Sequence, residues 1–228
     1  MTIIIFTLII LLFSVVIHEI AHGSMAYYLG DPTAKHAGRL TLNPLKHLDP
    51  LGSVILPLLL IIMGSPLLIG WAKPVPINSY NFKNQKWDNA KVALAGPGIN
   101  ILIAFIFGIF TRFLPLESTI KCAIVTSFFT GNIEALYGLL QVSFVAQIFF
   151  AFCIITILNL LLAIFNLVPI PPLDGSHILF LFLSEKYLKF KIILQQYGFF
   201  FLIFFIFFGG LRLLFLGVSI IFYLICGV

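Results

Sequence analysis

Residues 3–27 read IIIFTLIILLFSVVIHEIAHGSMAY, an apolar run with a short polar motif near its end. At a rise of 1.5 Å per residue, a helix of this length matches a hydrocarbon thickness of about 30 Å. His18, Glu19 and His22 are the only acidic, basic or histidine side chains among the first 30 residues. An ionisable group inside a membrane costs at least about 2.5 kcal/mol on insertion scales, so these three side chains indicate a functional site.

The spacing of the His-Glu-Ile-Ala-His motif predicts a metal site. On an α-helix, residues four apart project from nearly the same face, so His18 and His22 can bind one zinc ion while Glu19 reaches a water molecule bound to it. The alternative is a pair of histidines that satisfy each other's hydrogen bonds inside a helix bundle.

The composition extends this interpretation to the whole chain. Of 228 residues, 61% are hydrophobic and 9% are charged, and the mean hydropathy is +1.15. These values lie outside the range of soluble globular domains. The apolar residues gather in six runs, at about 3–27, 51–71, 91–113, 139–165, 173–183 and 192–227.

We therefore expect an all-α polytopic membrane protein with about five to six transmembrane helices. The polar stretches are all short loops, so we expect one membrane-embedded domain over residues 1–228. Its catalytic core covers about 1–183, and C-terminal helices cover about 192–227.

A third metal ligand is expected where the apolar sequence is broken by prolines. The stretch NLVPIPPLDG, residues 166–175, contains three prolines, which remove backbone donors and disfavour helical geometry. Irregular backbone at membrane depth is tolerated only against protein or a water-filled cavity. Catalytic zinc usually has three protein ligands, and Asp174 is the one aspartate outside the loops. The alternative role for Asp174, before Gly175, is a helix cap.

At this point the chain resembles the site-2 protease family of intramembrane zinc metalloproteases. The similarity rests on HEIAH in the first run, on Asn166 placed eight residues before Asp174, and on PPLDG. It extends to about residue 183 through GDPT (30–33), GRLTLNP (38–44), HLDP (47–50), GWAKPVP (70–76) and AGPGIN (95–100). The chain looks like a compact member without the PDZ domain that some relatives carry.

The resemblance implies one zinc ion bound by His18, His22 and Asp174, with Glu19 as the catalytic acid and base. It also implies that Asn166 helps to bind substrate or to stabilise the oxyanion. The alternative for Asn166 is an amide that satisfies carbonyls freed by the prolines. The expected substrates are single-span or multi-span membrane proteins, cleaved within or near the bilayer in regulated intramembrane proteolysis.

The convergence of these ligands constrains the topology. If 139–174 runs in the direction of 3–27, then 91–113 runs opposite to both, and 51–71 must enter and leave on one side as a re-entrant segment. Cytoplasmic loops are rich in Lys and Arg. A re-entrant 51–71 places ten basic residues on one side and two, Arg112 and Lys121, on the other, whereas a full crossing gives seven and five.

This charge difference favours the re-entrant form, with the zinc site toward the cytoplasmic side of the cell membrane, which in a bacterium is the inner membrane. The fold would include a short extended loop near the active site. Residues 38–45 lack helical periodicity, so they form either an extended edge that aligns substrate by strand addition or a plain surface turn.

Two other classes of membrane protein compete with a protease: a transporter of zinc or other ions, and a nonproteolytic relative that keeps the metal for structure. A transporter has little need of Glu19 as a base, and no inverted repeat is evident. Nucleic acid is not an expected partner, because the basic residues sit in loops between apolar runs. The sequence leaves the oligomeric state open.

Overall fold

The structure is a computed structural model that describes residues 2–55, 58–59, 62–63 and 70–227. The predicted all-α membrane class is confirmed, because the described residues form helices and connecting loops without a β-strand. The helices are α1 (Thr2–Tyr28), α2 (Thr33–His36), α4 (Gln85–Phe113), α5 (Ser118–Phe129), α6 (Ile133–Gln141), α7 (Phe144–Asn166), α8 (Gly175–Phe182), α9 (Leu188–Phe205) and α10 (Leu211–Cys226).

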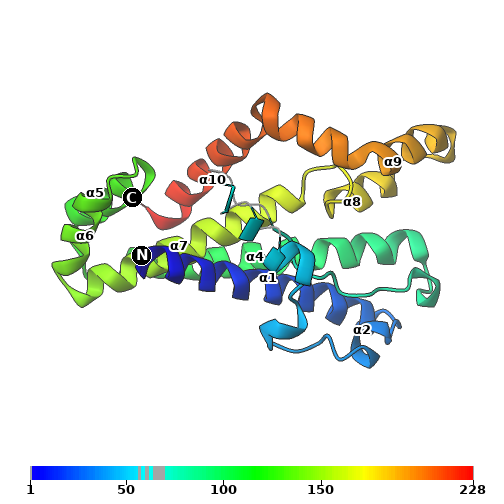
Figure 1. Ribbon diagram of the computed structural model, residues 1–228, viewed down its shortest axis with the longest axis horizontal. Helices are drawn as coiled ribbons and strands as arrows, with labels where there is room; N and C mark the ends of the chain where they lie inside the picture. The colour runs from blue at the N-terminus through cyan, green and yellow to red at the C-terminus, as the bar shows by residue number, and fades with distance from the viewer. Residues whose placement is uncertain (1, 56–57, 60–61, 64–69, 228) are drawn as a thin grey trace.

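Three long helices form the centre of the molecule. Helix α4 packs along both α1 and α7, and α10 lies across α7 and α4 (Figure 1). Helices α1 and α7 run in the same direction and α4 runs opposite to them, as the convergence of the ligands requires. A buried Asn159 amide on α7 donates to the Ser14 hydroxyl on α1 at 3.0 Å, which fixes the register of these two helices one turn before His18.

Four segments of the described chain are long and apolar enough to cross a membrane: Ile3–Tyr28, Gln85–Phe113, Phe144–Asn166 and Leu188–Cys226. The last has 39 residues and bends at Gly209, whose φ of 96° is outside helical geometry. This bend divides it into α9 and α10. The count of five to six transmembrane helices expected from the sequence includes the 51–71 run, part of which lies outside the described residues.

Two helices, α5 and α6, have no counterpart among the sequence predictions. Helix α5 has 12 residues, too few to span a bilayer. Both lie at one end of the molecule, near the two chain termini (Figure 1), and they pack against each other and against α7. The Asn132 side chain caps α6, and Ser143 caps α7 by accepting from the Ala146 amide. The apolar run at 139–165 therefore belongs to two helices.

The two ends of the 51–71 run lie side by side. Leu48 and Ala72 form an antiparallel β-bridge, the Trp71 amide donates to the Gly52 carbonyl at 3.2 Å, and the Ser53 hydroxyl donates to the Trp71 carbonyl. A single crossing would separate these ends by about 30 Å. The run therefore begins and ends at one place, as the re-entrant form predicts, although residues 56–57, 60–61 and 64–69 at its centre lie outside the described part.

Residues 38–45 take the form of a surface turn and not of an extended edge. Within the described chain they contain no strand, and Pro44–Lys46 form a short 3₁₀ helix. The Asn43 side chain accepts from the Leu45 amide and stabilises this turn, because asparagine before proline favours a local cap over strand pairing. Of the irregular backbone that follows α1, the segment 73–78 instead reaches the predicted site: it follows the β-bridge at Ala72, and its Val75 amide donates to Glu19.

We predict that residues 42 and 80 face the same side of the membrane. With the three native cysteines replaced by serine, Leu42→Cys and Tyr80→Cys, which are 61% and 88% exposed, should react with a membrane-impermeant thiol reagent from one side. Glu134→Cys on α6 should react from the other side and serves as the control. Labelling of residues 42 and 80 from opposite sides would show that 51–71 crosses the bilayer.

Candidate metal centre

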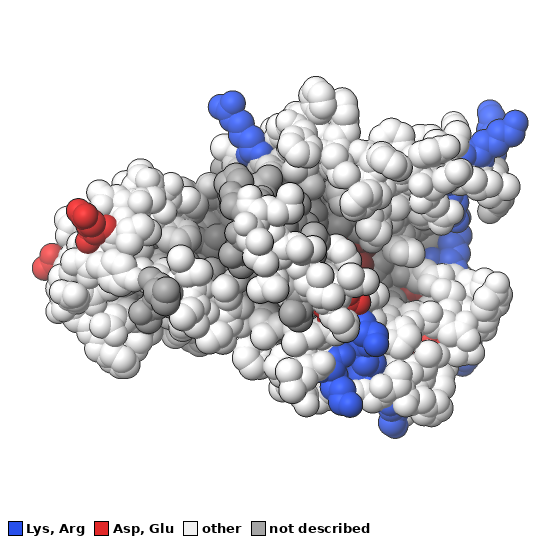
Figure 2. Space-filling model, in the orientation of Figure 1, with Lys and Arg blue, Asp and Glu red and all other residues white. Residues whose placement is uncertain are grey.

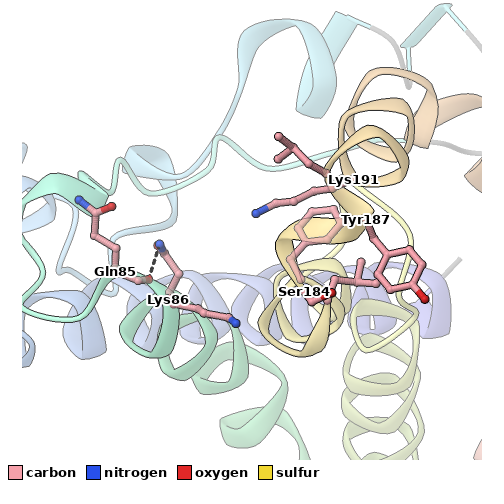
Figure 3. A pocket seen from close by; sticks show the side chains of 9 residues that line it. Gln85, Lys86, Ser184, Tyr187 and Lys191 are labelled. Carbon is pink, nitrogen blue, oxygen red and sulfur yellow. Dashed lines mark hydrogen bonds between the residues drawn. The ribbon is translucent and has the colours of Figure 1, made fainter.

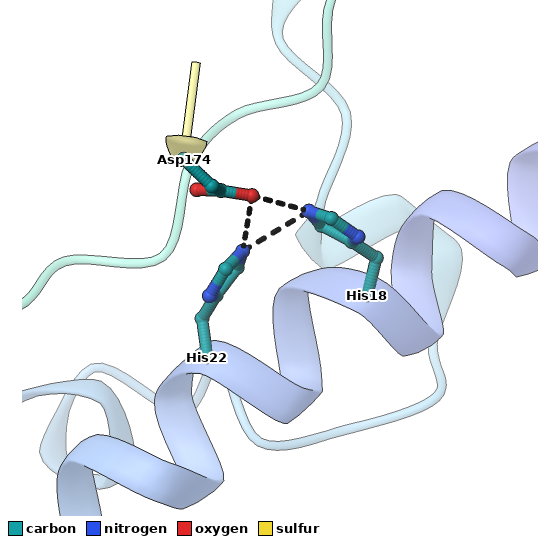
Figure 4. Close-up of side chains that lie close together, drawn as sticks. All are labelled: His18, His22 and Asp174. Carbon is teal, nitrogen blue, oxygen red and sulfur yellow. Dashed lines mark hydrogen bonds and ion pairs between the residues drawn. The ribbon is translucent and has the colours of Figure 1, made fainter. Parts of the chain in front are cut away.

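The structure brings His18, His22 and Asp174 together at one point (Figure 4). The Nε2 atoms of the two histidines are 3.0 Å apart, and each lies 3.2 Å from Asp174 Oδ2. Both histidines are buried, at 6% and 7% exposure. His18 and His22, one helical turn apart on α1, thus meet Asp174, which lies 152 positions after His22 in the sequence. This convergence was predicted from the motif spacing and the proline break.

The hydrogen bonds on the far side of each ring determine which nitrogen faces the centre. His22 Nδ1 donates to the Val92 carbonyl at 2.7 Å, and His18 Nδ1 contacts Asn100 Oδ1 at 3.0 Å. An acceptor at Nδ1 places the proton of a neutral imidazole there and leaves a lone pair on Nε2. Both Nε2 lone pairs therefore face the Asp174 carboxylate.

This donor set fits a metal cation. Asp174 Oδ2 is buried and has no hydrogen-bond partner, although both Nε2 atoms are close to it, because three acceptors face one another. Such an arrangement is repulsive unless a cation lies between them. In tetrahedral zinc sites with bonds of about 2.0 to 2.1 Å, ligand atoms are about 3.3 Å apart, and the three separations here are close to that value.

The proline loop after α7 sets the position of Asp174. Helix α7 ends at Asn166, and α8 begins at Gly175. A Cβ added at Gly175 would lie 2.2 Å from the Leu167 carbonyl oxygen, so only glycine lets the first turn of α8 fold back against the end of α7. The Asp174 side chain forms no capping hydrogen bond with α8. This excludes the helix-cap alternative and leaves the carboxylate directed at the histidines.

Helix α4 supplies two residues to which the sequence analysis gave no role. A Cβ added at Gly96 would lie 2.3 Å from His22 Nε2 and 2.7 Å from His18 Cε1, so the α4 backbone packs directly on both imidazoles. One turn later, the fully buried Asn100 accepts from His18. The sequence contained a signal for this contact: Gly96 and Asn100 lie four residues apart within AGPGIN, and so on one face of a helix.

Glu19 is held by the irregular segment 73–78. Its Oε2 accepts from the Val75 amide at 2.8 Å, whereas no donor among the described residues contacts its Oε1. The buried Arg39 guanidinium fixes this segment by donating to the carbonyls of Lys73 and Pro74. Backbone at 73–78 therefore orients the carboxylate beside the two histidines and leaves one of its oxygens available.

Asp31 anchors the far end of the same segment. Burial opposes ionisation of its carboxyl, but hydrogen bonds from Thr33, the Asn78 amide and the Asn81 side chain outweigh burial and hold the pKa of Asp31 below its usual value. These bonds tie the loop after α1 to residues 78–81. The GDPT motif thus anchors the chain just after the GWAKPVP motif, whose Val75 amide holds Glu19.

Asn166 lies at the last position of α7, and its side-chain amide donates to the Leu162 carbonyl at 2.9 Å. No hydrogen bond in the described part of the chain joins this side chain to His18, His22 or Asp174. In the structure it satisfies a carbonyl of its own helix, so its role with substrate stays a prediction.

Comparisons with known proteins agree with the geometry. A sequence model described as "Peptidase family M50" matches residues 6–205. YwhC of Bacillus subtilis, named as a candidate zinc metalloprotease, is 40% identical over 174 residues, which cover 76% of this chain and 67% of that protein. Rip2 of Mycolicibacterium smegmatis, named in the same way, is 30% identical over 72% of this chain.

Rip2 of Mycobacterium tuberculosis is also 30% identical over 72% of this chain. This chain spans 52% of the length of both Rip2 proteins. No solved structure matches the chain.

The close approach of α4 to the imidazoles predicts unequal effects of two alanine substitutions. Gly96→Ala places a methyl group on His22 Nε2 and should remove most zinc binding. Gly98→Ala lies on the same helix, where an added Cβ meets no atom within 4 Å, and should leave zinc affinity within about twofold of wild type. Competition with a chromogenic chelator measures both affinities, and equal affinities for the two variants would contradict this packing.

The contact between Asn100 and His18 predicts a smaller loss. Asn100→Ala removes the group that orients His18 and should weaken zinc binding by about 10 to 100-fold, as loss of a hydrogen bond behind a metal ligand does. Asn100→Asp keeps an acceptor at Nδ1 and should retain more affinity than the alanine variant. An alanine variant with wild-type affinity would show that Asn100 only fills space.

Proposed function

Because the chain belongs to peptidase family M50, we propose that it is a zinc-dependent endopeptidase that hydrolyses peptide bonds of membrane proteins within or beside the bilayer. The observation that carries the proposal is the buried convergence of His18 Nε2, His22 Nε2 and Asp174 Oδ2 within 3.2 Å. This triad opens beside Glu19, a carboxylate held in place by a backbone amide.

The three converging side chains would hold one zinc ion. Bound zinc supplies Lewis acidity: it lowers the pKa of a water ligand to about 7 and polarises a carbonyl. Glu19 is the general base, which takes a proton from the attacking water and returns it to the leaving nitrogen. The Val75 amide holds one oxygen of Glu19, and the free oxygen carries the proton. Asn166, at the end of α7, is proposed to bind the substrate backbone or the oxyanion.

The peptide substrate must reach this centre in an unfolded form, because a helical backbone buries the scissile bond in its own hydrogen bonds. The irregular segments 73–78 and 167–174 border the site from two sides. Irregular backbone at membrane depth lies against protein or a water-filled cavity, and we propose that the water consumed in hydrolysis reaches the centre along these two segments. Single-span or multi-span membrane proteins are the proposed substrates, in regulated intramembrane proteolysis.

We also propose that the centre faces the cytoplasm. In Figure 2 basic side chains gather at the right-hand and lower parts of the molecule, where some acidic atoms also lie, and another basic side chain stands at the upper edge. The left-hand end, near α5 and α6, shows acidic side chains and no basic one on this face. The two basic residues at that end, Arg112 and Lys121, bind helix C-termini: Arg112 donates to the carbonyls of Leu224 and Ile225, and Lys121 to those of Thr111 and Arg112. The positive-inside rule then favours the other end as cytoplasmic.

The proposal is tested with the purified full chain in detergent and tagged single-span substrates. Wild type should cleave with about one zinc bound, cleavage should stop with a chelator, and zinc should restore it. Glu19→Gln should keep zinc but lose about 10² to 10⁴-fold in rate, the usual contribution of a general base. Glu117→Gln, an exposed carboxylate before α5, is the matched control and should cleave normally. Undiminished cleavage by Glu19→Gln would refute the mechanism.

A further inference from the structure

A polar cleft lies between the start of α4 and the segment that runs from α8 into α9. Two adjoining cavities of about 280 and 220 Å³ have Gln85, Lys86, Asn89, Phe180 and Lys191 in common, and therefore form one continuous cleft. The metal centre and Glu19 do not line it, so the chemistry of the proposed reaction leaves the cleft unexplained.

The cleft is cationic. Figure 3 shows Lys191 reaching from α9 toward the start of α4, and Lys86 reaching from α4 toward α8 and the turn after it. The Lys191 ammonium lies 5.1 Å from the centre of the Phe180 ring. No Asp or Glu is among the described lining residues, and no described carboxylate forms an ion pair with either lysine. Two like charges that face one cleft, with no carboxylate among the described residues that line it, attract an anionic group.

Helix α8 connects the cleft to the metal centre. Asp174 immediately precedes α8, and His177, three residues further on, lines the cleft. The eight residues of α8 cover about 12 Å at 1.5 Å per residue. An extended peptide covers that distance in about four residues. A polypeptide held at the centre and continuing along α8 therefore enters the cleft a few residues from its reacting bond.

We infer that this cleft selects substrates by charge, an inference that rests on the proposed function. It binds the part of the substrate on the cleft side of the cleaved bond and favours Asp or Glu about three to six residues from that bond over Lys or Arg. Lys86 and Lys191 are the specificity-determining residues. Membrane proteins usually carry Lys and Arg in their cytoplasmic flanks, so such a cleft would reject most of them and accept a minority.

A polypeptide fits the cleft better than an anionic lipid headgroup does. The Gln85 and Gln195 side chains line it, and each amide both donates and accepts hydrogen bonds, which matches the peptide backbone. A phosphate group only accepts hydrogen bonds. The cleft also begins at His177, three residues after Asp174, where a substrate chain that continues along α8 would pass.

The test uses two single-span substrates that differ only in three residues on the cleft side of the cleavage site, Glu in one and Lys in the other. Wild type should cleave the Glu substrate with a kcat/KM about tenfold higher. The double variant Lys86→Glu/Lys191→Glu should prefer the Lys substrate. The control Lys83→Glu/Lys189→Glu changes the net charge equally, at exposed neighbouring positions that do not line the cleft, and should keep the wild-type preference.

Zinc-dependent cleavage of both substrates at equal rates would overturn the inference and leave the proposed function intact. A shift of preference in the control pair as large as in the cleft pair would overturn it as well. In vesicles with and without phosphatidylglycerol, an increase of both rates with the anionic lipid that disappears in Lys86→Glu/Lys191→Glu would assign the cleft to a lipid headgroup instead. Failure of wild type to cleave either substrate would contradict the proposed function itself.

Discussion

The main constraint on this fold is the arrangement at the metal centre. Two imidazole nitrogens and one carboxylate oxygen face one another there, inside an apolar helix bundle. Each group is costly to bury alone, and the three acceptors repel one another. A bound cation removes both penalties, since it is attracted to all three. The buried Asp174 Oδ2, which lacks a hydrogen-bond donor, is the clearest sign that the site is built for a metal ion.

Several parts of the fold exist to hold this arrangement. Gly96 lets α4 approach the imidazoles, and Val92 and Asn100 fix the direction of their lone pairs. Gly175 lets α8 turn back on α7 and carries Asp174 to the histidines. The loop network of Asp31 and Arg39 acts one step further away, by placing the Val75 amide against Glu19. A change in any of these residues would act through geometry on the proposed metal ligands or on Glu19.

Much of this was predictable from local chemistry. His18 and His22 are four residues apart on one apolar helix, and Asp174 is an acidic residue at a proline break, so spacing and the cost of burial were enough to predict that the three meet. The count of basic residues on each side of the membrane predicted that the two ends of the 51–71 run lie together. In contrast, α5 and α6 were missed because short helices lack the length that marks a span.

The partners of the site were harder to predict, because they depend on tertiary contacts. Asn100 and Val75 are 82 and 56 positions away in sequence from the side chains that they hold, and no local pattern states such a pairing. Of the two alternatives for 38–45, an extended edge and a surface turn, the structure has the turn, because Asn43 and Pro44 favour a local cap. The cationic cleft arises only when α4, α8 and α9 are brought together.

X-ray absorption spectroscopy of the zinc-loaded protein in detergent identifies the atoms that bind the metal. We predict one zinc ion with two imidazole nitrogens and carboxylate or water oxygens at about 2.0 to 2.1 Å, and a changed oxygen shell in Asp174→Asn. A spectrum without imidazole scattering, or one that is identical in wild type and Asp174→Asn, would contradict it.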